Sequence, residues 1–332
     1  MIECVFTIDY EIYGNGEGAL RDLIYEPASK LINLFSENDM RFVAFVEAAE
    51  LEIMEKLGSH DSMGDIKRQI SEMYRQGFEI GLHLHPQWYN ARYENNAWLL
   101  DYGEYNLCLL SRKRIMEIID RSITYLRNVL GVSEFSPLAF RAGNWLFQPT
   151  GTVADLLAAK GIKIDSSVFK GGLQRDLNLD YRPAQKNGYF WRFQEDVNVD
   201  DPGGKLMEFP TYTEMVPSWK MVTAKRMNMT HKRRSAHVPG VVKLRRYLDF
   251  IRWRYPLKLD FCRMTLNELV RMMEHLIGEE RKDPTVYRPI VAIGHTKDLV
   301  DIKNVALFIG YLKERGIAVS TFAQVYARTC LS

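Results

Sequence analysis

The sequence predicts an α/β fold in which parallel strands alternate with helices and close into a barrel. Short runs rich in Val, Ile and Phe alternate along the chain with helical patterns, which is the order of repeated βα units. Several of the strand-like runs end in ionisable residues, and α/β enzymes place their chemistry at that carboxyl edge. With 332 residues and 46% hydrophobic content, the chain is long enough to bury one large core.

The expected strands are followed by polar or glycine-containing sequence and lie near residues 2–9, 41–47, 77–84, 136–141, 161–166, 205–210, 289–294 and 317–321. The expected helices have apolar residues at helical spacing and lie over residues 20–37, 63–76, 111–130 and 265–280. Another helix opens at Thr150, with Val153, Leu156 and Leu157 on one face. The sequence shows no internal repeat and no low-complexity tract.

Two histidines, His83 and His85, end the third expected strand. Side chains two residues apart on a strand project to the same side, so both imidazoles are expected to face one space. Two imidazoles that converge on one point suggest a metal ion. The competing interpretation is a hydrogen-bonded or solvent-facing pair, which is the more frequent use of such histidines.

The first expected strand ends in two carboxylates with the same spacing, Asp9 and Glu11. These side chains are also expected to share a face. Two histidines and a carboxylate are a common ligand set for zinc or a similar divalent ion. The sequence therefore suggests a metal site built from the carboxyl ends of two strands.

The stretch Thr7-Ile8-Asp9-Tyr10-Glu11 resembles the T-F-D-D-G motif of the polysaccharide deacetylase superfamily, which shares the NodB homology domain and is typified by carbohydrate esterase family 4. In that motif one Asp acts as the base and the next binds the metal. The resemblance implies that Asp9 is the catalytic base. Tyr10 occupies the ligand position, so Glu11 is expected to replace the metal-binding Asp.

The family's H-[ST]-x-x-H-P motif is similar to the compressed His83-Leu84-His85-Pro86. The resemblance implies that His83 and His85 both bind the metal. A set in which His83 binds with Gln87 or Tyr89 stays open. The expected cofactor is a divalent metal ion, with zinc as the first expectation.

Three later stretches match further family motifs in the family's order. The sequence F-R-A-G-N-W resembles R-x-P-Y and implies that Arg141 pairs with Asp9 and keeps it ionised. The sequence G-I-K-I-D-S-S-V is similar to D-x-[SA]-W and implies that Asp165 orients Arg141. The late strand P-I-V-A-I-G-H-T matches the last motif and implies that His295 is the general acid.

The resemblance implies a distorted (β/α) barrel of seven or eight parallel strands, formed as one domain over residues 1–332. It also implies a metal-dependent hydrolase that removes an N-acetyl group from an amino sugar in a polysaccharide or glycan precursor. Three alternatives stay open. The chain could be a degenerate homologue that binds a glycan without turnover, a hydrolase of another linear or cyclic amide C–N bond, or a structural partner in polysaccharide assembly.

Aromatic and amide residues around the expected site are candidates for substrate binding. The interval 88–105 is rich in Tyr, Trp and Asn, as a loop over a carbohydrate would be, and ordinary packing under a loop explains the same residues equally well. The candidate substrate contacts are Trp88, Tyr89, Asn144 and Trp145.

A basic insertion is expected over residues 217–260. Between residues 217 and 258 the chain has twelve Lys and Arg residues and one acid, Asp249. The interval could be a solvated helical face, a surface for an anionic or lipid-linked glycan substrate, or a peripheral contact with an anionic membrane. Nucleic acid is not expected as a partner, because no recognised binding motif accompanies the charge.

The cysteines and the N-terminal sequence indicate in which compartment the protein is expected. The four cysteines are isolated and show no C-x-x-C spacing, so neither a disulfide framework nor a thiolate metal site is expected. The chain shows no basic leader, no apolar signal segment and no run as long as a membrane span. The expectation is a soluble cytoplasmic protein that acts on a precursor inside the cell.

Overall fold

The computed structural model describes residues 1–57, 62–217 and 253–330. Its centre is a nine-stranded sheet with the order β10-β11-β7-β6-β3-β2-β1-β14, in which β15 also pairs with β1. Neighbouring strands in it are parallel except for β10 and β11. The strands are β1 (Ile2–Tyr10), β2 (Val43–Glu47), β3 (Glu79–Leu84), β6 (Ala139–Ala142), β7 (Ile164–Asp165), β10 (Trp191–Phe193), β11 (Leu206–Glu208), β14 (Arg288–His295) and β15 (Ala318–Val319).

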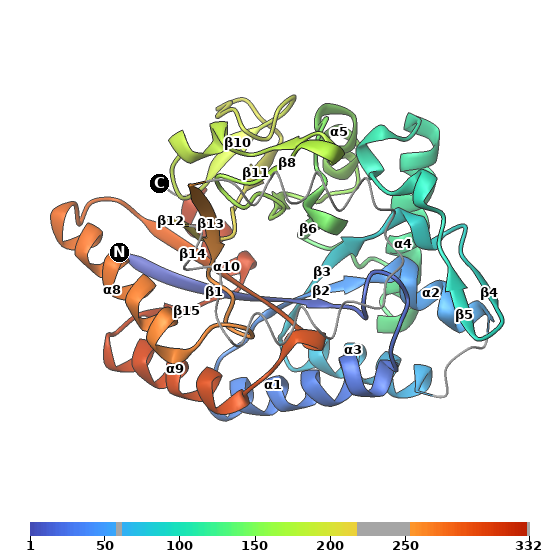
Figure 1. The fold of residues 1–332 in the computed structure, drawn as a ribbon, viewed down its shortest axis with the longest axis horizontal. Coiled ribbons are helices and arrows are strands. Elements are labelled where there is room, and N and C mark those ends of the chain that lie inside the picture. The colour runs from blue at the N-terminus through green and yellow to red at the C-terminus, as the bar shows by residue number, and fades with distance from the viewer. Residues whose placement is uncertain (58–61, 218–252, 331–332) are drawn as a thin grey trace.

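The sheet curls until its two sides meet, and β1 crosses the middle of the molecule in Figure 1. Thr211, just beyond β11, forms a parallel bridge with Val291 of β14. The Tyr212 N–H donates to the Val291 carbonyl at 2.9 Å. This closure, with eight strands in parallel pairings among the described residues, confirms the predicted distorted (β/α) barrel.

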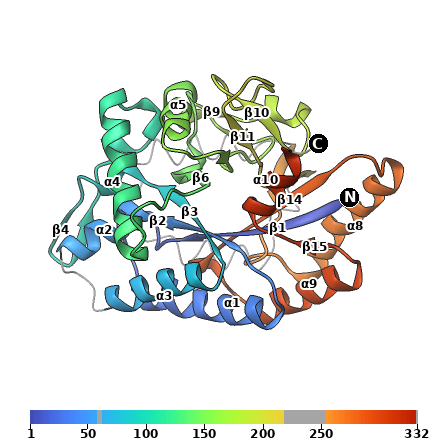
Figure 2. The same cartoon turned by 180° about the vertical axis from the view of Figure 1, so that it is seen from behind.

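Helices cover the outside of the sheet, and Figures 1 and 2 show α8, α9, α1 and α3 along one side of it. Their ends follow capping signals in the sequence. Ser111 accepts from the Arg114 N–H at the start of α4, and Thr265 forms a capping box with Glu268 at the start of α8. The helices are α1 (Glu26–Glu37), α2 (Ala48–Leu57), α3 (Met63–Arg75), α4 (Arg112–Leu130), α5 (Gly151–Ala159), α8 (Leu266–Lys282), α9 (Ile302–Glu314) and α10 (Phe322–Thr329).

Alternation along the strands separates an outer core from an inner one. On β1, Phe6 packs in the cluster shared with the helices, whereas Val5 belongs to a second cluster inside the barrel. Helix α10 plugs this inner cluster, since the Phe322 ring lies 6.1 Å from that of Phe45 and 5.6 Å from that of Phe209. The amino half of the barrel is therefore filled with apolar side chains, and polar inward positions are left at the carboxyl half.

The expected strands and helices are all present, with ends shifted by a few residues. Helices α2, α9 and α10 were not predicted. Helix α2 follows β2 directly, with no Gly, Pro or Asn between them to mark the change. None of the described helices is both long and apolar enough to cross a bilayer.

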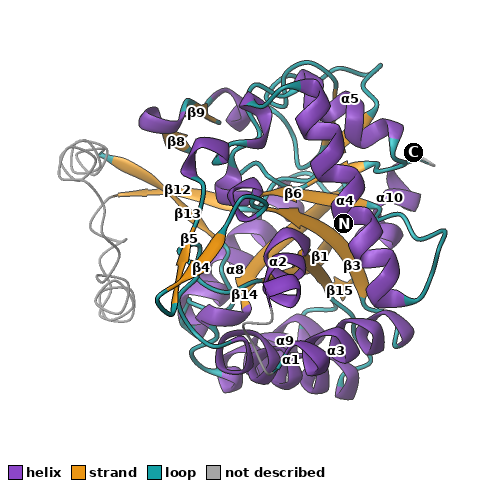
Figure 3. Cartoon of the chain, turned by 90° about the vertical axis from the view of Figure 1, so that its right-hand side faces the viewer, coloured by secondary structure: helices purple, strands orange, loops and turns teal. Residues whose placement is uncertain are grey.

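Among the described residues, three pairs of antiparallel strands lie outside the central sheet. Figure 3 shows β12 and β13 extending outward from the body of the molecule. These two strands flank residues 218–252, so most of the predicted basic insertion at 217–260 lies outside the described residues. The three strand pairs are β4 (Arg92–Glu94) with β5 (Ala97–Leu99), β8 (Leu173–Gln174) with β9 (Leu179–Asp180), and β12 (Thr213–Pro217) with β13 (Arg254–Lys258).

Candidate metal and catalytic site

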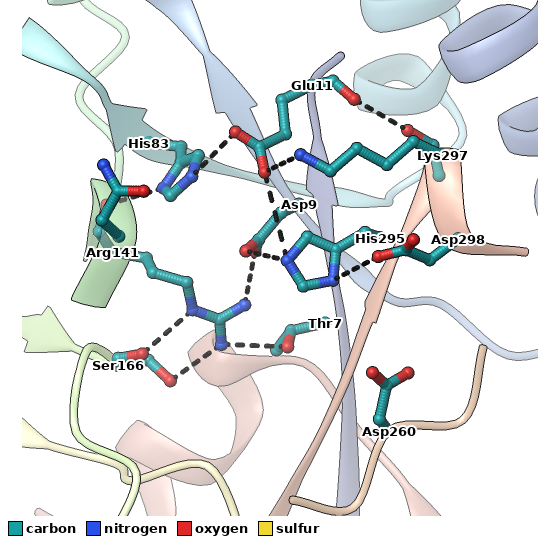
Figure 4. Close-up of polar contacts among 12 residues, drawn as sticks. Thr7, Asp9, Glu11, His83, Arg141, Ser166, Asp260, His295, Lys297 and Asp298 are labelled. Carbon is teal, nitrogen blue, oxygen red and sulfur yellow. Dashed lines mark hydrogen bonds and ion pairs between the residues drawn. The ribbon is translucent and has the colours of Figure 1, made fainter. Parts of the chain in front are cut away.

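Ionisable side chains follow the inner apolar cluster toward the carboxyl ends of the strands. The same period-two alternation that turns Val5 inward also turns its neighbours two, four and six residues later inward. Figure 4 shows several of these side chains directed toward one another. The inward groups at this end are Asp9 and Glu11 from β1 and the residue after it, Glu47 from β2, His83 and His85 from β3 and the residue after it, Arg141 from β6, and His295 from β14.

An ion pair between Arg141 and Asp9 lies at the centre of the site. Arg141 Nη1 donates to Asp9 Oδ1 at 2.6 Å. Its other nitrogens donate to Thr7 Oγ1 at 3.0 Å and to the carbonyl and hydroxyl oxygens of Ser166 at 2.9 and 3.1 Å. Burial alone would raise the pKa of Asp9, but Arg141, with His83 and His295, lowers it below its usual range. Asp9 is therefore an ionised carboxylate held in one orientation.

Glu11 lies against both histidines. Its Oε2 is 3.0 Å from His85 Nε2 and 3.5 Å from His83 Nε2. The other nitrogen of His83, Nδ1, is 2.8 Å from the Arg141 carbonyl, which accepts its proton. His83 Nε2 faces Glu11. Burial alone would lower the pKa of His83, but Asp9 and Glu11 raise it to about 9, so Nε2 carries a proton that a metal ion would have to displace.

Two carboxamides orient His85. Its Nδ1 accepts from the Asn144 amide nitrogen at 3.2 Å and from the Gln87 amide nitrogen at 3.3 Å, which leaves the ring proton on Nε2, facing Glu11. A carboxamide presents either oxygen or nitrogen after a half-turn, and Gln87 Oε1 is buried without another partner in the described part of the chain. A half-turn of the Gln87 carboxamide would bring that oxygen toward His85, so that Nδ1–H could donate to it and Nε2 would be free for a metal. Asn144, expected as a substrate contact, thus touches a candidate ligand.

Lys297 is a second cation in the site, and it lies two residues after His295. Its Nζ donates to Glu11 Oε1 at 2.6 Å and to the Ile12 carbonyl at 2.7 Å. Burial alone would raise the pKa of Glu11, but Lys297 and His85 lower it well below its usual range. Lys297 was not predicted as a site residue, although a charged residue two positions after the last residue of β14 is a candidate for the site.

His295 lies on the open side of the site. Its Nε2 is 3.3 Å from Asp9 Oδ2, and its Nδ1 is 3.7 Å from Asp298 Oδ2. Its side chain is 16% exposed, whereas that of Asp9 is 4% exposed. Among these three residues, His295 is therefore the one that a molecule entering the barrel would meet.

Glu47 is a further inward carboxylate that the sequence analysis missed. It ends β2, is paired in register with His83 of β3, and is fully buried. Burial raises its pKa to about 8. Alternation of side chains along β2 predicts its inward direction. Val43 and Phe45 belong to the inner cluster, and Glu47 is the next residue on that face.

Asp165 does not orient Arg141 as expected. In register it pairs with Glu208 of β11, while its neighbour Ile164 belongs to the inner cluster, so the Asp165 side chain points to the outer face. Its oxygens accept from the Ser167 N–H and hydroxyl at 3.1 and 2.6 Å. The next residue, Ser166, contacts Arg141 instead.

Trp88 and Tyr89 are packing residues and offer no open face to a sugar. Trp88 is fully buried against Trp98, with ring centroids 5.1 Å apart. The Tyr89 hydroxyl lies 2.6 Å from Ser122 Oγ, and Arg121 covers its ring. Of the two explanations for these aromatic residues, a loop over a carbohydrate and ordinary packing under a loop, the contacts of Trp88 and Tyr89 agree with packing.

Trp145 is the expected substrate residue that stays at the site surface. It is half-buried and has a φ of +67°, which is uncommon for a residue with a side chain. The Lys258 ammonium, at the end of β13, lies 3.7 Å from the Trp145 ring centroid and 4.1 Å from that of Phe169. Burial, followed by the nearby charge of Arg263, lowers the Lys258 pKa to about 7.

Among the described residues, two groups of side chains could hold a metal ion, and they share Glu11. Within each group the possible ligand atoms lie within 4.8 Å of one another. One consists of Glu11, Glu47, His83 and His85, and the other of Asp9, Glu11 and His295. The imidazole nitrogens and carboxylate oxygens of the first group are ligands that first-row divalent ions accept. The residues therefore fit a divalent metal ion.

Comparisons with known proteins show what the fold resembles. No protein-family model matches the chain, and no curated protein matches it. A Mycobacterium smegmatis protein described as a polysaccharide deacetylase has a similar structure, with 15% identity, a TM-score of 0.52, and coverage of 98% of this chain and 89% of that one. The Puue allantoinase is similar at 13% identity and a TM-score of 0.51, covering 98% and 88%. The chain shares the polysaccharide deacetylase fold with both.

Proposed function

We propose that this chain is a divergent polysaccharide deacetylase that hydrolyses an N-acetyl group on an amino sugar with the help of a divalent metal ion. The observation that carries the proposal is the contact of Glu11 Oε2 with both histidine Nε2 atoms, next to the Asp9 that Arg141 holds. The M. smegmatis protein of the same fold supports the choice of substrate class.

Glu11, His83 and His85 would hold the metal, with zinc as the first candidate. Glu11 is favoured as the carboxylate ligand because its Oε2 faces the Nε2 atoms of both histidines, whereas the Asp9 oxygens face Arg141 and His295. When bound, the ion polarises the acetyl carbonyl and lowers the pKa of water toward neutrality.

Asp9 is the proposed base. An ionised carboxylate in this position accepts a proton from the water whose oxygen attacks the acetyl carbon. Arg141 keeps Asp9 charged and, through Ser166 and Thr7, fixed in direction. A fixed acceptor needs no reorganisation during the reaction.

His295 is the proposed acid. Its Nε2 lies next to Asp9 Oδ2 and on the more exposed side of the site. As the bond between carbonyl carbon and nitrogen breaks, His295 gives a proton to the departing nitrogen. The products are acetate and a free amino sugar.

An anionic substrate is favoured by Lys258. Its half-buried ammonium lies over Trp145 and Phe169 and has no carboxylate within ion-pair distance among the described residues. An uncompensated ammonium next to an aromatic face suits a sugar with a carboxylate or phosphate group. A lipid-linked diphosphate sugar and an acidic polysaccharide both have this chemistry.

The test is metal content together with acetate release. Purified protein should contain about one equivalent of a divalent ion, and it should release acetate from N-acetylated sugar precursors. If the protein binds metal but releases no acetate from any acetylated sugar, another amide substrate would be favoured. Failure to bind zinc, cobalt or nickel would remove the metal-dependent proposal.

A second candidate is a glycan-binding protein that does not turn its ligand over. The Lys297 ammonium already neutralises Glu11 at 2.6 Å, which is the task a metal would otherwise perform. Calorimetry with acetylated glycans in the presence of a chelator separates the two candidates, since the binding protein would keep its affinity without metal.

A further inference from the structure

Glu47 is buried in the site with one oxygen unused. Its Oε1 accepts from the backbone N–H groups of Ala49 and Glu50 at 3.1 and 3.4 Å, at the start of α2. Its Oε2 is buried and has no hydrogen-bond partner among the described residues. A buried carboxylate oxygen without a donor or a cation is costly, so such an atom points to a missing partner.

The Arg and Lys side chains of the site pair with other carboxylates. Arg141 pairs with Asp9, and Lys297 pairs with Glu11. Glu47 instead shares its surroundings with the metal-binding nitrogens, because its ligand atom lies within 4.8 Å of those of Glu11, His83 and His85. The register of β2 on β3 places it beside His83.

We propose that Glu47 is a fourth protein ligand of the metal, bound through Oε2 while Oε1 continues to cap α2. This inference rests on the metal site of the proposed function. Glu47 would add a negative charge to a site in which Lys297 already offsets the charge of Glu11. The backbone donors at Oε1 would hold the carboxylate in place, as outer-shell partners do in metal sites.

A four-ligand set also changes the expected coordination. Four protein ligands fill the tetrahedral shell of a structural zinc site, whereas a catalytic ion keeps a position for water or substrate. The site should therefore hold an ion with five or six ligands, such as cobalt(II), manganese(II) or five-coordinate zinc.

The first experiment measures metal affinity of the full chain by competition with a chromophoric chelator. Glu47→Gln keeps an oxygen for the α2 cap but loses the anion, and we expect cobalt(II) and zinc affinity to fall by more than the about 10- to 100-fold that loss of an outer-shell partner costs. The matched control is Glu50→Gln. Glu50 is also buried and accepts from the Ile12 N–H at 3.0 Å, but it lies outside both metal-binding groups. The Glu50→Gln variant should therefore bind cobalt(II) and zinc with wild-type affinity.

The second measurement does not depend on the variant folding. In the cobalt(II)-loaded wild type, weak visible absorption bands would indicate five or six ligands, and a crystal structure should show Glu47 Oε2 at bonding distance from the ion. Wild-type affinity in Glu47→Gln, or an ion remote from Glu47, would overturn the inference and leave the proposed function standing. A wild type that binds no metal would overturn both.

Discussion

Arg141 Nη1 lies 2.6 Å from Asp9 Oδ1, although 132 residues separate the two along the chain. Strands β1 and β6 are not neighbours in the sheet, so only the curvature of the barrel brings their inward side chains into contact. Neither side chain is accessible at this depth, with Arg141 at 0% and Asp9 at 4% exposure. Both charges would be costly to bury alone, so each stabilises the other's burial.

Asp9→Asn should abolish turnover and leave the metal bound. The amide cannot accept the proton of water, and loss of a general base typically costs about 10²- to 10⁴-fold in rate. Acetate release and metal content measured on the same preparation provide the check. If Asp9→Asn loses metal and Glu11→Gln keeps it, then Asp9 is the ligand and the assigned roles are reversed.

Arg141→Met should move the acidic limb of the rate profile to higher pH. In the wild type the pKa of Asp9 is lowered, so the base stays ionised well into acid. Without the guanidinium, only His83 and His295 still oppose the burial that raises this pKa, and Asp9 becomes protonated at a higher pH. The profile of kcat/KM against pH measures the shift.

Asp165→Asn is the control for Arg141→Met. Asp165 faces the outer side of the sheet and bonds to Ser167, so its replacement should leave the acidic limb in place. A shift equal to that of Arg141→Met would restore Asp165 as the residue that orients Arg141.

His83→Ala and His85→Ala should each lose the metal. Each change removes an imidazole whose Nε2 faces Glu11. Plasma mass spectrometry of both variants should find well below one equivalent, while His275→Ala should match the wild type, since His275 is exposed on α8 and contacts Glu214. Full metal content in either site variant would reassign the ligands.

Lys258→Met should raise KM for a substrate with a carboxylate or phosphate group by about tenfold or more, the range of a charge-assisted hydrogen bond. A neutral acetylated sugar should be hydrolysed with nearly unchanged KM, since Met preserves contact with Trp145. Lys205→Met removes an exposed, remote ammonium and serves as the control. An equal effect on both substrates would contradict recognition of the anion.

Charge removal at Arg233, Arg234, Arg245 and Arg246 tests the basic insertion, which the sequence alone predicts. Affinity for an anionic glycan or for anionic vesicles should fall, and the loss should be largest at low salt, where charges are least screened. Metal content should not change. Affinity that is independent of salt would favour the solvated helical face.

Local sequence patterns were enough to predict the order of βα units and the pairs Asp9 with Glu11 and His83 with His85. These depend on local periodicity, since residues two apart on a strand share a face whatever the sheet does. Motif order also placed Arg141 and His295 at strand ends. Boundaries were less certain, because turns and caps set them.

The direction in which each strand faces, and which strand ends meet, depend on how the whole sheet closes. Alternation turned Asp165 outward and Glu47 inward, and both depend on which side of the closed sheet is the interior. Likewise, Trp88 is core and Lys258 is at the site because chain segments distant in sequence close around them. Side-chain partners across the barrel arise from its curvature, which no local pattern encodes.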